Sequence, residues 1–398
     1  MKIAYIHQYF KTPEEGGAIR SYHFAKALVS EGREVHVITA YNQNKESYKN
    51  IEGIHVHYLP VFYSNSLSFG SRIISFIKFL YLAYRKTLSL KGVQLCYATS
   101  TPLTIGMVAL LLKSRKKIPY FFEVRDLWPE APIQMGFIKN PILIKLLYAL
   151  EKKIYRNAEK IIALSPGIYE RIIEKVSSDK EVVLIPNFAD LDFFGEAENK
   201  TPNFPKLPSA EELKDTFIIS YTGAMGKANG LNSLPPIIRA CYHHYKEKVL
   251  FLMAGDGSEK EALLNSLQEL PNVRYMGFLN KDQIRKLLHV SHASLISFAP
   301  HPVLETTSPN KFFDALAAGK MCIVNYKGWI KELIESQEAG FYFNPAKPDE
   351  FIEKLQPFVD SGEKRHQTME AASKLGKEHF SLAHQREKFL DLFSEQAE

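Results

Sequence analysis

One short segment in the second half of the chain, "TSPNKFFDALAAGK" at residues 307–320, combines residue types that could bind an anion. Ser308 is a good helix N-cap and Pro309 suits the first helical position. Lys311 would then lie in the first turn, where the helix dipole disfavours a cation unless an anion such as a phosphate is also bound. Asp314, one turn later, leans back toward the same end and could reach a sugar hydroxyl beside that phosphate.

The same segment also permits an ordinary interpretation. Lys311 could be solvated, and Asp314 could simply complement the helix dipole. A charge that opposes the dipole at a capped helix end calls for a partner, so the sequence favours the anion site.

A second candidate phosphate site is the loop "YTGAMGKANG" at residues 221–230. It follows the apolar run "FIIS", and a glycine-rich turn directly after a strand is typical of phosphate-binding loops. Such a loop usually opens a nucleotide-binding domain. Its position near the middle of the chain therefore predicts that a second domain begins here.

Length and composition agree with two domains. A chain of 398 residues exceeds one ordinary hydrophobic core, and its 45% hydrophobic and 24% charged residues are typical of globular proteins. The formal net charge of +6 is diffuse, without the dense basic blocks and spaced aromatics of nucleic-acid-binding proteins. This mild excess suits a phosphorylated substrate or an anionic membrane surface.

The cysteines and the apolar segments bear on the compartment. Cys96, Cys241 and Cys322 are far apart and form no CxxC, which argues against a disulfide framework and a zinc site and favours the cytoplasm. The first residues, "MKIAYIHQYF", predict a strand rather than a signal peptide. The longest apolar stretch, residues 73–84, is interrupted by a lysine and is too short to span a bilayer.

β-Branched and aromatic runs alternate with helical patterns in both halves of the chain. The predicted strands are 2–7, 34–39, 54–59, 93–98, 119–124, 160–165, 182–186, 216–222, 248–255, 272–278, 292–298, 321–326 and 340–344. Strand–helix alternation predicts the α/β class with parallel sheets that are covered on both faces.

The polar, proline-rich residues 195–212 read as a linker between two such domains. The prediction is a Rossmann-like domain at 1–194 and a second one at 213–379, with a C-terminal helix at about 380–398 packed back on the first. Ligands of doubly wound sheets bind outside the carboxyl ends of the strands, so two facing sheets would form one cleft.

With these elements in place, the chain resembles a GT-B-fold glycosyltransferase of family 4. It is similar in particular to the bacterial branch that resembles N-acetylfucosamine (L-fucosamine) transferases of surface-polysaccharide assembly. The matching segments, in family order, are "PEEGGAIRSYHFAKALVSEGREVHVIT", "FEVRDLWPEAP", "ALSPGIYERI", "LIPNFADLDFF", "YTGAMGKANGL", "MAGDGSEK", "YMGFL" and "SPNKFFDALAAGK".

The resemblance implies a nucleotide-diphosphate sugar, with UDP as the carrier, that is bound mainly by the second domain. It also implies transfer with retention of configuration, no bound metal and no cofactor. The sugar would be an N-acetylated hexosamine such as N-acetylfucosamine. The acceptor would be a glycan or a polyprenyl-diphosphate-linked glycan in capsule or O-antigen synthesis, held by the first domain of a cytoplasmic enzyme that is peripheral on the inner face of the membrane.

By position, the resemblance assigns donor binding to glycine loops and to one helix start. These residues are Gly16, Gly17, Gly223, Lys227, Gly277, Phe278, Ser308, Pro309, Asn310, Lys311 and Asp314. The helix start would hold the diphosphate, Asp314 the ribose hydroxyls, and the backbone around Gly277 and Phe278 the base.

The second domain departs from the family pattern in its acidic pair and in its loop cations. The family commonly has two glutamates separated by seven residues. Here the second is Asp314, and the position seven residues earlier is Thr306 with Glu305 beside it, so either residue could take the first acidic position. The common arginine and lysine of the loop are replaced, which leaves Lys227 as its cation.

The first domain departs as well, because the family's "HD" falls at Arg125–Asp126. We therefore predict Asp126, Glu305 and Lys227 as catalytic residues. Arg125 and His7, which ends the first strand, are the predicted acceptor-binding residues.

Two further features carry open alternatives. Asp190 and Asp192 form a DxD, which we interpret as turn and capping groups because no third carboxylate or histidine is near in sequence. Residues 72–92 and 111–117 mix apolar side chains with lysine and arginine, which fits equally a buried helix and a membrane-surface or lipid-acceptor role.

Three other functions share parts of this pattern. A sugar-nucleotide 2-epimerase has the same two-domain architecture and would turn over a nucleotide sugar without an acceptor. A dinucleotide oxidoreductase would need GxGxxG, which the loop at 223–230 lacks. A non-catalytic two-domain binder of nucleotide sugars would bind its ligand without turnover.

Overall fold

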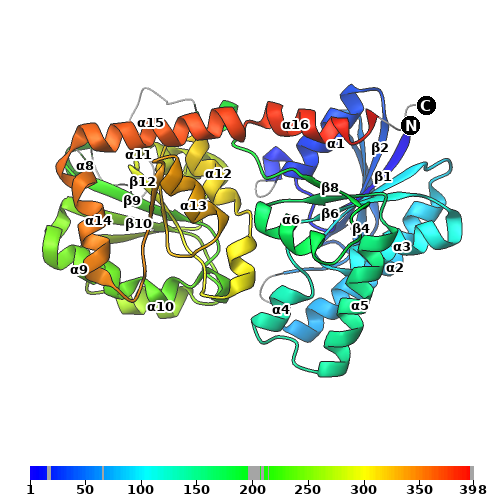
Figure 1. The fold of residues 1–398 in the computed structure, drawn as a ribbon, viewed down its shortest axis with the longest axis horizontal. Helices are drawn as coiled ribbons and strands as arrows, with labels where there is room; N and C mark the ends of the chain where they lie inside the picture. The colour runs from blue at the N-terminus through cyan, green and yellow to red at the C-terminus, as the bar shows by residue number, and fades with distance from the viewer. Residues whose placement is uncertain (16–18, 65–66, 196–206, 208–209, 214, 395–398) are drawn as a thin grey trace. The chain divides into compact units, whose positions relative to one another are not determined.

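The computed structural model describes the chain except residues 16–18, 65–66, 196–206, 208–209, 214 and 395–398 (Figure 1). The chain divides into two compact units, each with its own sheet. The first unit contains Met1–Pro186, Thr306–Ser308 and the chain from Gln385 onward, and the second contains Asn187–Glu305 and Pro309–His384. Among the described helices, none is both long and apolar enough to cross a membrane.

The first unit is built on an eight-stranded sheet in the order β3-β4-β2-β1-β5-β6-β7-β8. Its strands are β1 (Lys2–Ile6), β2 (Glu34–Tyr41), β3 (Ser47–Ile51), β4 (Ile54–Pro60), β5 (Leu95–Thr99), β6 (Tyr120–Val124), β7 (Lys160–Ala163) and β8 (Glu181–Leu184). All neighbouring strands are parallel except β3, which pairs with β4 in the antiparallel direction.

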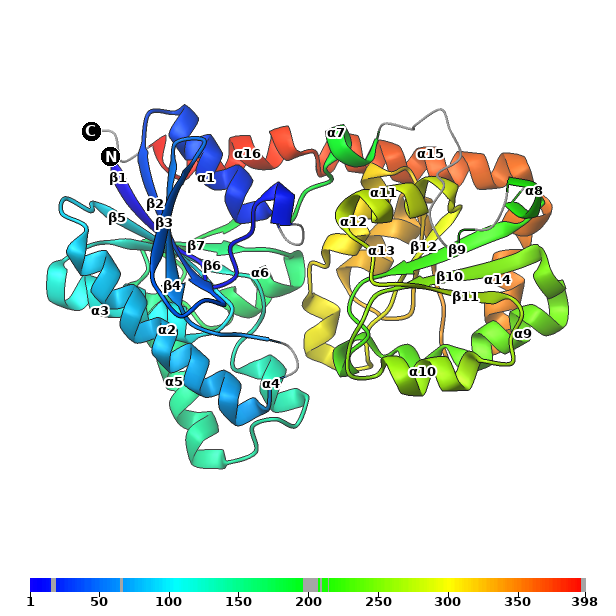
Figure 2. The same ribbon diagram turned by 180° about the vertical axis from the view of Figure 1, so that it is seen from behind.

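Helices cover both faces of this sheet (Figures 1 and 2). They are α1 (Arg20–Ser30), α2 (Phe69–Ser89), α3 (Thr104–Lys116), α4 (Glu130–Gln134), α5 (Pro141–Asn157), α6 (Pro166–Ile173) and α16 (Leu382–Asp391). On one face, Phe24 of α1 stacks on Phe389 of α16 with the ring centroids 4.1 Å apart. The chain end thereby completes the core of the first unit, where Leu392 and Phe393 are also buried.

The second unit is built on a six-stranded parallel sheet in the order β11-β10-β9-β12-β13-β14. Its strands are β9 (Phe217–Thr222), β10 (Val249–Ala254), β11 (Val273–Gly277), β12 (Ala293–Ile296), β13 (Met321–Val324) and β14 (Gly340–Tyr342). Its helices are α7 (Leu191–Phe194), α8 (Ala210–Leu213), α9 (Pro235–Tyr245), α10 (Lys260–Leu267), α11 (Lys281–Val290), α12 (Asn310–Ala317), α13 (Trp329–Ser336), α14 (Pro348–Asp360) and α15 (Gly362–His379).

The structure confirms every predicted strand and adds one. The sequence analysis missed β3, because its residues "SYKNI" are polar and mostly exposed, as is common for a strand at a sheet edge. The boundary predicted at residue 194 differs from the observed one, because Ala189 and Phe194 are buried in the core of the second unit. The predicted linker lies mostly outside the described residues.

In the second unit, the loops at the carboxyl ends of β9, β10 and β11 contact one another through glycines. Gly223 after β9 donates its N–H to the Ala254 carbonyl, and Met225 donates to the Asp256 carbonyl. Gly255 has a φ of +143°, and a Cβ there would lie 1.8 Å from the Gly223 carbonyl oxygen. The close approach of these loops therefore requires glycine at position 255.

We expect Gly255→Ala to destabilise the second unit strongly, because the new methyl group would force the loop after β9 to move. Gly277→Ala is the control, since Gly277 also has a positive φ, of +82°, but has open space where a Cβ would be. The control should lose about 1–2 kcal/mol of unfolding free energy, and Gly255→Ala on the order of 4 kcal/mol. Equal losses in urea unfolding would mean that the loops can separate.

Candidate functional site

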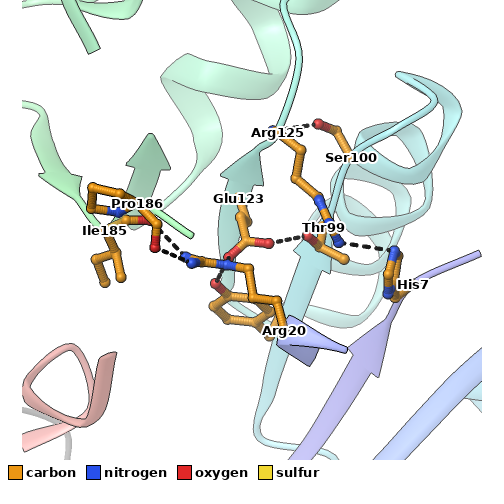
Figure 3. Close-up of polar contacts among 9 residues, drawn as sticks. His7, Arg20, Thr99, Ser100, Glu123, Arg125, Ile185 and Pro186 are labelled. Carbon is orange, nitrogen blue, oxygen red and sulfur yellow. Dashed lines mark hydrogen bonds and ion pairs between the residues drawn. The ribbon is translucent and has the colours of Figure 1, made fainter. Parts of the chain in front are cut away.

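Each unit gathers polar side chains at the carboxyl ends of its central strands. In the first unit the centre of this group is Glu123, at the end of β6 (Figure 3). Its fully buried carboxylate accepts hydrogen bonds from Arg20 Nε at 3.0 Å, Tyr97 Oη at 2.8 Å and Thr99 Oγ1. Burial alone would raise the pKa of Glu123, but the charges of Arg20 and Arg125 and these hydrogen bonds outweigh it, and the net shift is downward.

Arg20, the first residue of α1, is buried beside Glu123, and each of its three guanidinium nitrogens donates a hydrogen bond. While Nε contacts the carboxylate, Nη2 donates to the Ile185 carbonyl at 2.7 Å and Nη1 to the Pro186 carbonyl. Figure 3 shows the guanidinium between Glu123 and these two carbonyls. The pair thus connects the start of α1 to β6 and to the chain that leaves β8.

His7, directly after β1, lies beside Arg125, directly after β6 (Figure 3). Arg125 Nη1 donates to His7 Nε2 at 3.2 Å, so the imidazole carries its proton on Nδ1. Burial, and then the charge of Arg125, hold the pKa of His7 well below its usual range, so the ring is neutral. The predicted acceptor-binding residues are therefore in contact with each other.

Polar atoms at this end of β1 lack partners within the described chain. His7 Nδ1 and both polar atoms of the Gln8 side chain are buried and form no hydrogen bond to another described residue. Buried polar groups are almost always hydrogen-bonded, so these atoms point to a ligand or to water.

Asp126 lies next to this group and is held by one hydrogen bond. Its Oδ2 accepts from Thr101 Oγ1 at 2.8 Å, and the preceding backbone N–H, of Arg125, donates to Ser100 Oγ at 3.0 Å. The loops after β5 and β6 thus orient the carboxylate and leave Oδ1 without a described partner. This geometry permits a role as base or acceptor ligand, and the catalytic role stays a prediction.

In the second unit, Lys311 on α12 lies against Gly223, which follows β9. A Cβ at Gly223 would lie 3.4 Å from both Cε and Nζ of Lys311. Nζ donates to Tyr221 Oη at 3.0 Å and lies 4.4 Å from the centroid of the Tyr221 ring. Tyr221 Oη in turn donates to the Ala224 carbonyl at 2.5 Å, which fixes the tyrosine against the glycine loop.

The charge of Lys311 has no counter-ion in the part of the chain that the structure describes. Its polar partner is a phenol, and the Phe298 ring lies 5.7 Å from Nζ. Burial lowers the pKa of Lys311 to about 7, so the folded protein carries a partly neutral amine at this position. An anion beside the loop would restore the charge by supplying the missing partner.

Asp314, one turn further along α12, lies near an ion pair of Lys281 and Asp190. Burial raises the pKa of Asp314 to about 7, with the charge of Lys281 opposing this shift and that of Asp190 adding to it. Lys281 Nζ is 2.8 Å from Asp190 Oδ2 and 4.0 Å from the Phe193 ring centroid. Asp314 therefore alternates between acid and carboxylate near neutral pH.

The other described residues that were predicted to bind the sugar donor lie at the same edge of the sheet, where its strands have their carboxyl ends. Gly277 ends β11, and the next residue, Phe278, has 79% of its surface exposed. In a parallel sheet, β11 is separated from β9 by one strand, or about 10 Å. Lys227 is exposed in the short turn Lys227–Asn229, and its side chain has no described partner.

Some expectations are corrected or fall outside the described residues. Helix α12 begins one residue later than predicted: Pro309 is the N-cap, with an extended ψ of 131°, and Ser308 is not the cap. Pro309 has a φ that its ring fixes, but it has no side-chain acceptor, so it cannot form a capping hydrogen bond. Gly16 and Gly17 lie outside the described residues.

The acidic residues outside the main site also have clear positions. Asp190 caps α7 through the Phe193 N–H at 3.4 Å, which confirms its predicted capping role, and Asp192 lies in the first turn of that helix. Glu305 lies in the short turn Pro302–Thr306, where its carbonyl is so close to Gly328 that a Cβ there would clash. Which of Glu305 and Thr306 takes the first acidic position stays a prediction.

The sequence analysis missed Arg20 and Glu123, the buried ion pair at the centre of the polar group in the first unit. The rule that drew attention to Lys311, a cation in the first turn of a helix, applies equally to Arg20. Its partner could not be found this way, because 103 positions separate the two residues.

Comparison with known proteins identifies both units. Residues 15–187 match a glycosyl transferase 4-like domain, and residues 216–361 match the glycosyl transferases group 1 domain. The probable glycosyltransferase WbjE of Pseudomonas aeruginosa is 23% identical over 258 residues, which span 63% of this chain and 62% of that protein.

Solved structures share the whole fold. Sucrose-phosphate synthase from Thermosynechococcus elongatus superposes with a TM-score of 0.77 at 15% identity, covering 99% of this chain and 98% of that one. The Anabaena protein HepE, solved in complex with UDP and glucose, gives a TM-score of 0.66 at 15% identity, covering 99% and 100%. Together with the two domain matches, these results show that the chain belongs to the GT-B glycosyltransferases.

We expect Glu123→Gln to destabilise the first unit by about 3–5 kcal/mol, because it leaves the buried Arg20 charge without its partner. Glu174→Gln is the matched control, since Glu174 pairs with Arg171 on the surface, 3.3 Å away. The control should change the unfolding free energy by less than about 1 kcal/mol in urea titrations. If both variants unfold at the same urea concentration, the buried pair does not hold the unit together.

Proposed function

We propose that this chain transfers an N-acetylated hexosamine, such as N-acetylfucosamine, from a UDP-sugar to a glycan or polyprenyl-linked acceptor with retention of configuration. The observation that carries the donor site is Lys311, a half-buried lysine without a described counter-ion, in contact with the glycine loop after β9. UDP as the carrier is supported by its presence in the complex of the similar HepE structure. The sugar, the acceptor and a place in capsule or O-antigen synthesis come from the family resemblance.

In the proposed complex the diphosphate lies between the loop at Gly223 and the start of α12. The N–H groups of the first helical turn and the ammonium of Lys311 then face the phosphate oxygens. When the bond between the sugar and UDP breaks, negative charge develops on the β-phosphate, and this lysine stabilises it. Lys227 and Glu305 complete the proposed catalytic set on the donor side.

The nucleoside then extends along the sheet toward β11. Asp314 as a carboxylate accepts hydrogen bonds from the ribose hydroxyls, and the base lies against Gly277 and the exposed ring of Phe278. Lysine, helix N–H groups and glycine loops supply the counter-charge and donors for the diphosphate. We therefore propose that the enzyme needs no metal ion to bind UDP.

The acceptor is assigned to the first unit. Asp126 Oδ1 accepts the proton of the acceptor hydroxyl while the hydroxyl oxygen bonds to the sugar on the face that UDP leaves, which retains the configuration. His7 Nδ1 and the side-chain amide of Gln8, which are buried without described partners, hydrogen-bond the acceptor, and Arg125 orients the imidazole. The ion pair of Glu123 and Arg20 holds Arg125 and the loop after β6 in position.

We further propose that the first unit binds the inner face of the membrane peripherally. On α2, Ile74, Ile77 and Tyr81 expose 55–69% of their surface, while Phe76 and Phe79 on the same helix are buried. On α5, Ile142, Leu143 and Leu146 expose 44–71%. The sequence of α2 contains no carboxylate and has several lysines and arginines, which suits an anionic lipid surface.

Replacing Lys311 with methionine should weaken UDP binding by about ten- to hundred-fold, the equivalent of one charge-assisted hydrogen bond. The control is Lys320→Met, because Lys320 is also a buried lysine, with a pKa lowered by burial to about 8, but bonds the His289 carbonyl instead. Calorimetry in EDTA and in Mg²⁺ should give the same result. If Lys311→Met bound UDP as tightly as the wild type, the diphosphate would not lie at this helix. If the wild type lost UDP binding in EDTA, binding would depend on a metal ion.

The Asp314 contribution to UDP affinity should fall as the pH drops below about 7, because protonated Asp314 can no longer accept from both ribose hydroxyls. Protonation of Lys311 acts in the opposite direction over the same range, so the contribution is measured as the ratio of wild-type to Asp314→Asn affinity. The sign follows from the raised pKa: the carboxylate is present above about 7 and is lost below it. Asp314→Asn should bind UDP about ten-fold more weakly at pH 8 and lose this contribution to the pH dependence.

Pyrophosphate is the control ligand for the same titration, because it carries the phosphate ionisation but no ribose. Its affinity should be equal in the wild type and in Asp314→Asn at every pH. A variant that loses pyrophosphate and UDP equally would place Asp314 at the phosphates.

Ile74→Ser with Ile77→Ser should reduce flotation with phosphatidylglycerol vesicles at low salt, because two exposed apolar contacts on α2 are lost. Ile173→Ser on α6 is the control, since Ile173 is also exposed, at 44%. Flotation of the wild type should decrease in high salt. Absence of wild-type binding at low salt would contradict the membrane role.

A further inference from the structure

A cluster of histidines lies at the outer edge of the first sheet, and the proposed glycosyl transfer does not use it. His36 is on β2, and His55 and His57 are on the neighbouring strand β4. The register pairs His36 with His55 and Ile38 with His57, so the three rings project from one face of the sheet. Glu34, two residues before His36, projects from the same face.

The side chains are close enough to share one ligand. Glu34 Oε1 is 2.9 Å from His36 Nε2, and the His36 and His55 rings stack with their centroids 4.7 Å apart. One donor atom from each of Glu34, His36 and His55 lies within 4.8 Å of the other two. Two imidazoles and one carboxylate form a donor set that zinc uses in proteins, with a further position open to water.

The nitrogens on the far side of the two rings are held by other side chains. His36 Nδ1 is 2.9 Å from His57 Nε2, and His55 Nδ1 is 2.7 Å from Tyr48 Oη. Metal-bound imidazoles almost always have the second nitrogen hydrogen-bonded in this way, which fixes the ring and its tautomer. The cluster thus contains the outer hydrogen bonds of a metal site as well as its donor atoms.

The Glu34 side chain also contacts Lys2, whose Nζ lies 2.9 Å from Glu34 Oε1. Lys2 also donates to the Lys91 carbonyl at 3.1 Å, and this bond remains if Glu34 turns to a metal.

We propose that Glu34, His36 and His55 bind a divalent transition-metal ion of the zinc class. The metal takes the lone pair of His36 Nε2, where the proton shared with Glu34 now lies. That proton moves to Nδ1, which donates to His57 Nε2, and His57 carries its own proton on Nδ1. Both rings change tautomer, and neither changes charge.

The position of this site indicates a structural role. Glu34 and His36 begin β2, and His55 lies near the start of β4, whereas ligands of parallel sheets bind at the carboxyl ends. The metal would join β2 to β4 and, through Tyr48, to the edge strand β3. It would stabilise the edge of the sheet without touching the donor or acceptor.

The test is Zn²⁺ binding to the metal-free full chain by calorimetry at pH 7.5, with thermal unfolding in parallel. One site should appear, and Zn²⁺ should raise the melting temperature by mass action. Glu34→Gln and His55→Gln each remove one ligand on the surface side and should weaken Zn²⁺ binding by at least about ten-fold. UDP affinity should stay unchanged in both variants, which separates this test from that of the transferase function.

His366→Gln is the matched control, because His366 forms an exposed histidine–glutamate pair with Glu370 on α15, at 3.7 Å. It should bind Zn²⁺ as the wild type does. The proposal is overturned if the wild type shows no Zn²⁺ binding at micromolar concentration. Equal affinities in the wild type, Glu34→Gln and His55→Gln would overturn it as well.

Discussion

The ion pair between Arg20 and Glu123 lies fully inside the first unit, and four neighbouring elements depend on it. The carboxylate also binds Tyr97 and Thr99 from β5, and the guanidinium binds the carbonyls that follow β8. Two charges removed from water are tolerated only when they have partners, and here the protein supplies partners for every guanidinium nitrogen and both carboxylate oxygens. The ends of β5, β6 and β8 and the start of α1 are therefore fixed, and with them Arg125 and Asp126.

Lys311 shows the opposite solution of the same electrostatic problem. It too is a cation at the start of a helix that follows a strand, but its described contacts are a phenol and aromatic rings rather than a carboxylate. The first unit thus supplies a counter-charge for Arg20, whereas the described residues of the second unit supply none for Lys311. An anion beside Lys311 would supply the missing partner, which is why we propose that the diphosphate binds there.

The sequence was sufficient for the two sheets and for every described strand except β3, because apolar periodicity is a local signal. It was insufficient where partners are distant or polar. Glu123 meets Arg20 across 103 positions, β3 lacks an apolar pattern, and the histidines of β2 and β4 converge only through the strand register. Helix α12 begins one residue later than the sequence predicts. A proline has a similar φ at the N-cap and in the first helical turn, so its presence alone does not distinguish the two positions.

The most direct test of the central claim is the number of protons taken up when UDP binds at pH 8, measured by calorimetry in buffers of different ionisation enthalpy. With a pKa of about 7, Lys311 is mostly neutral at pH 8 in the free protein. If a phosphate restores its charge, the wild type should take up close to one proton per UDP and Lys311→Met close to none. Equal uptake in both proteins, or none in the wild type, would contradict the account.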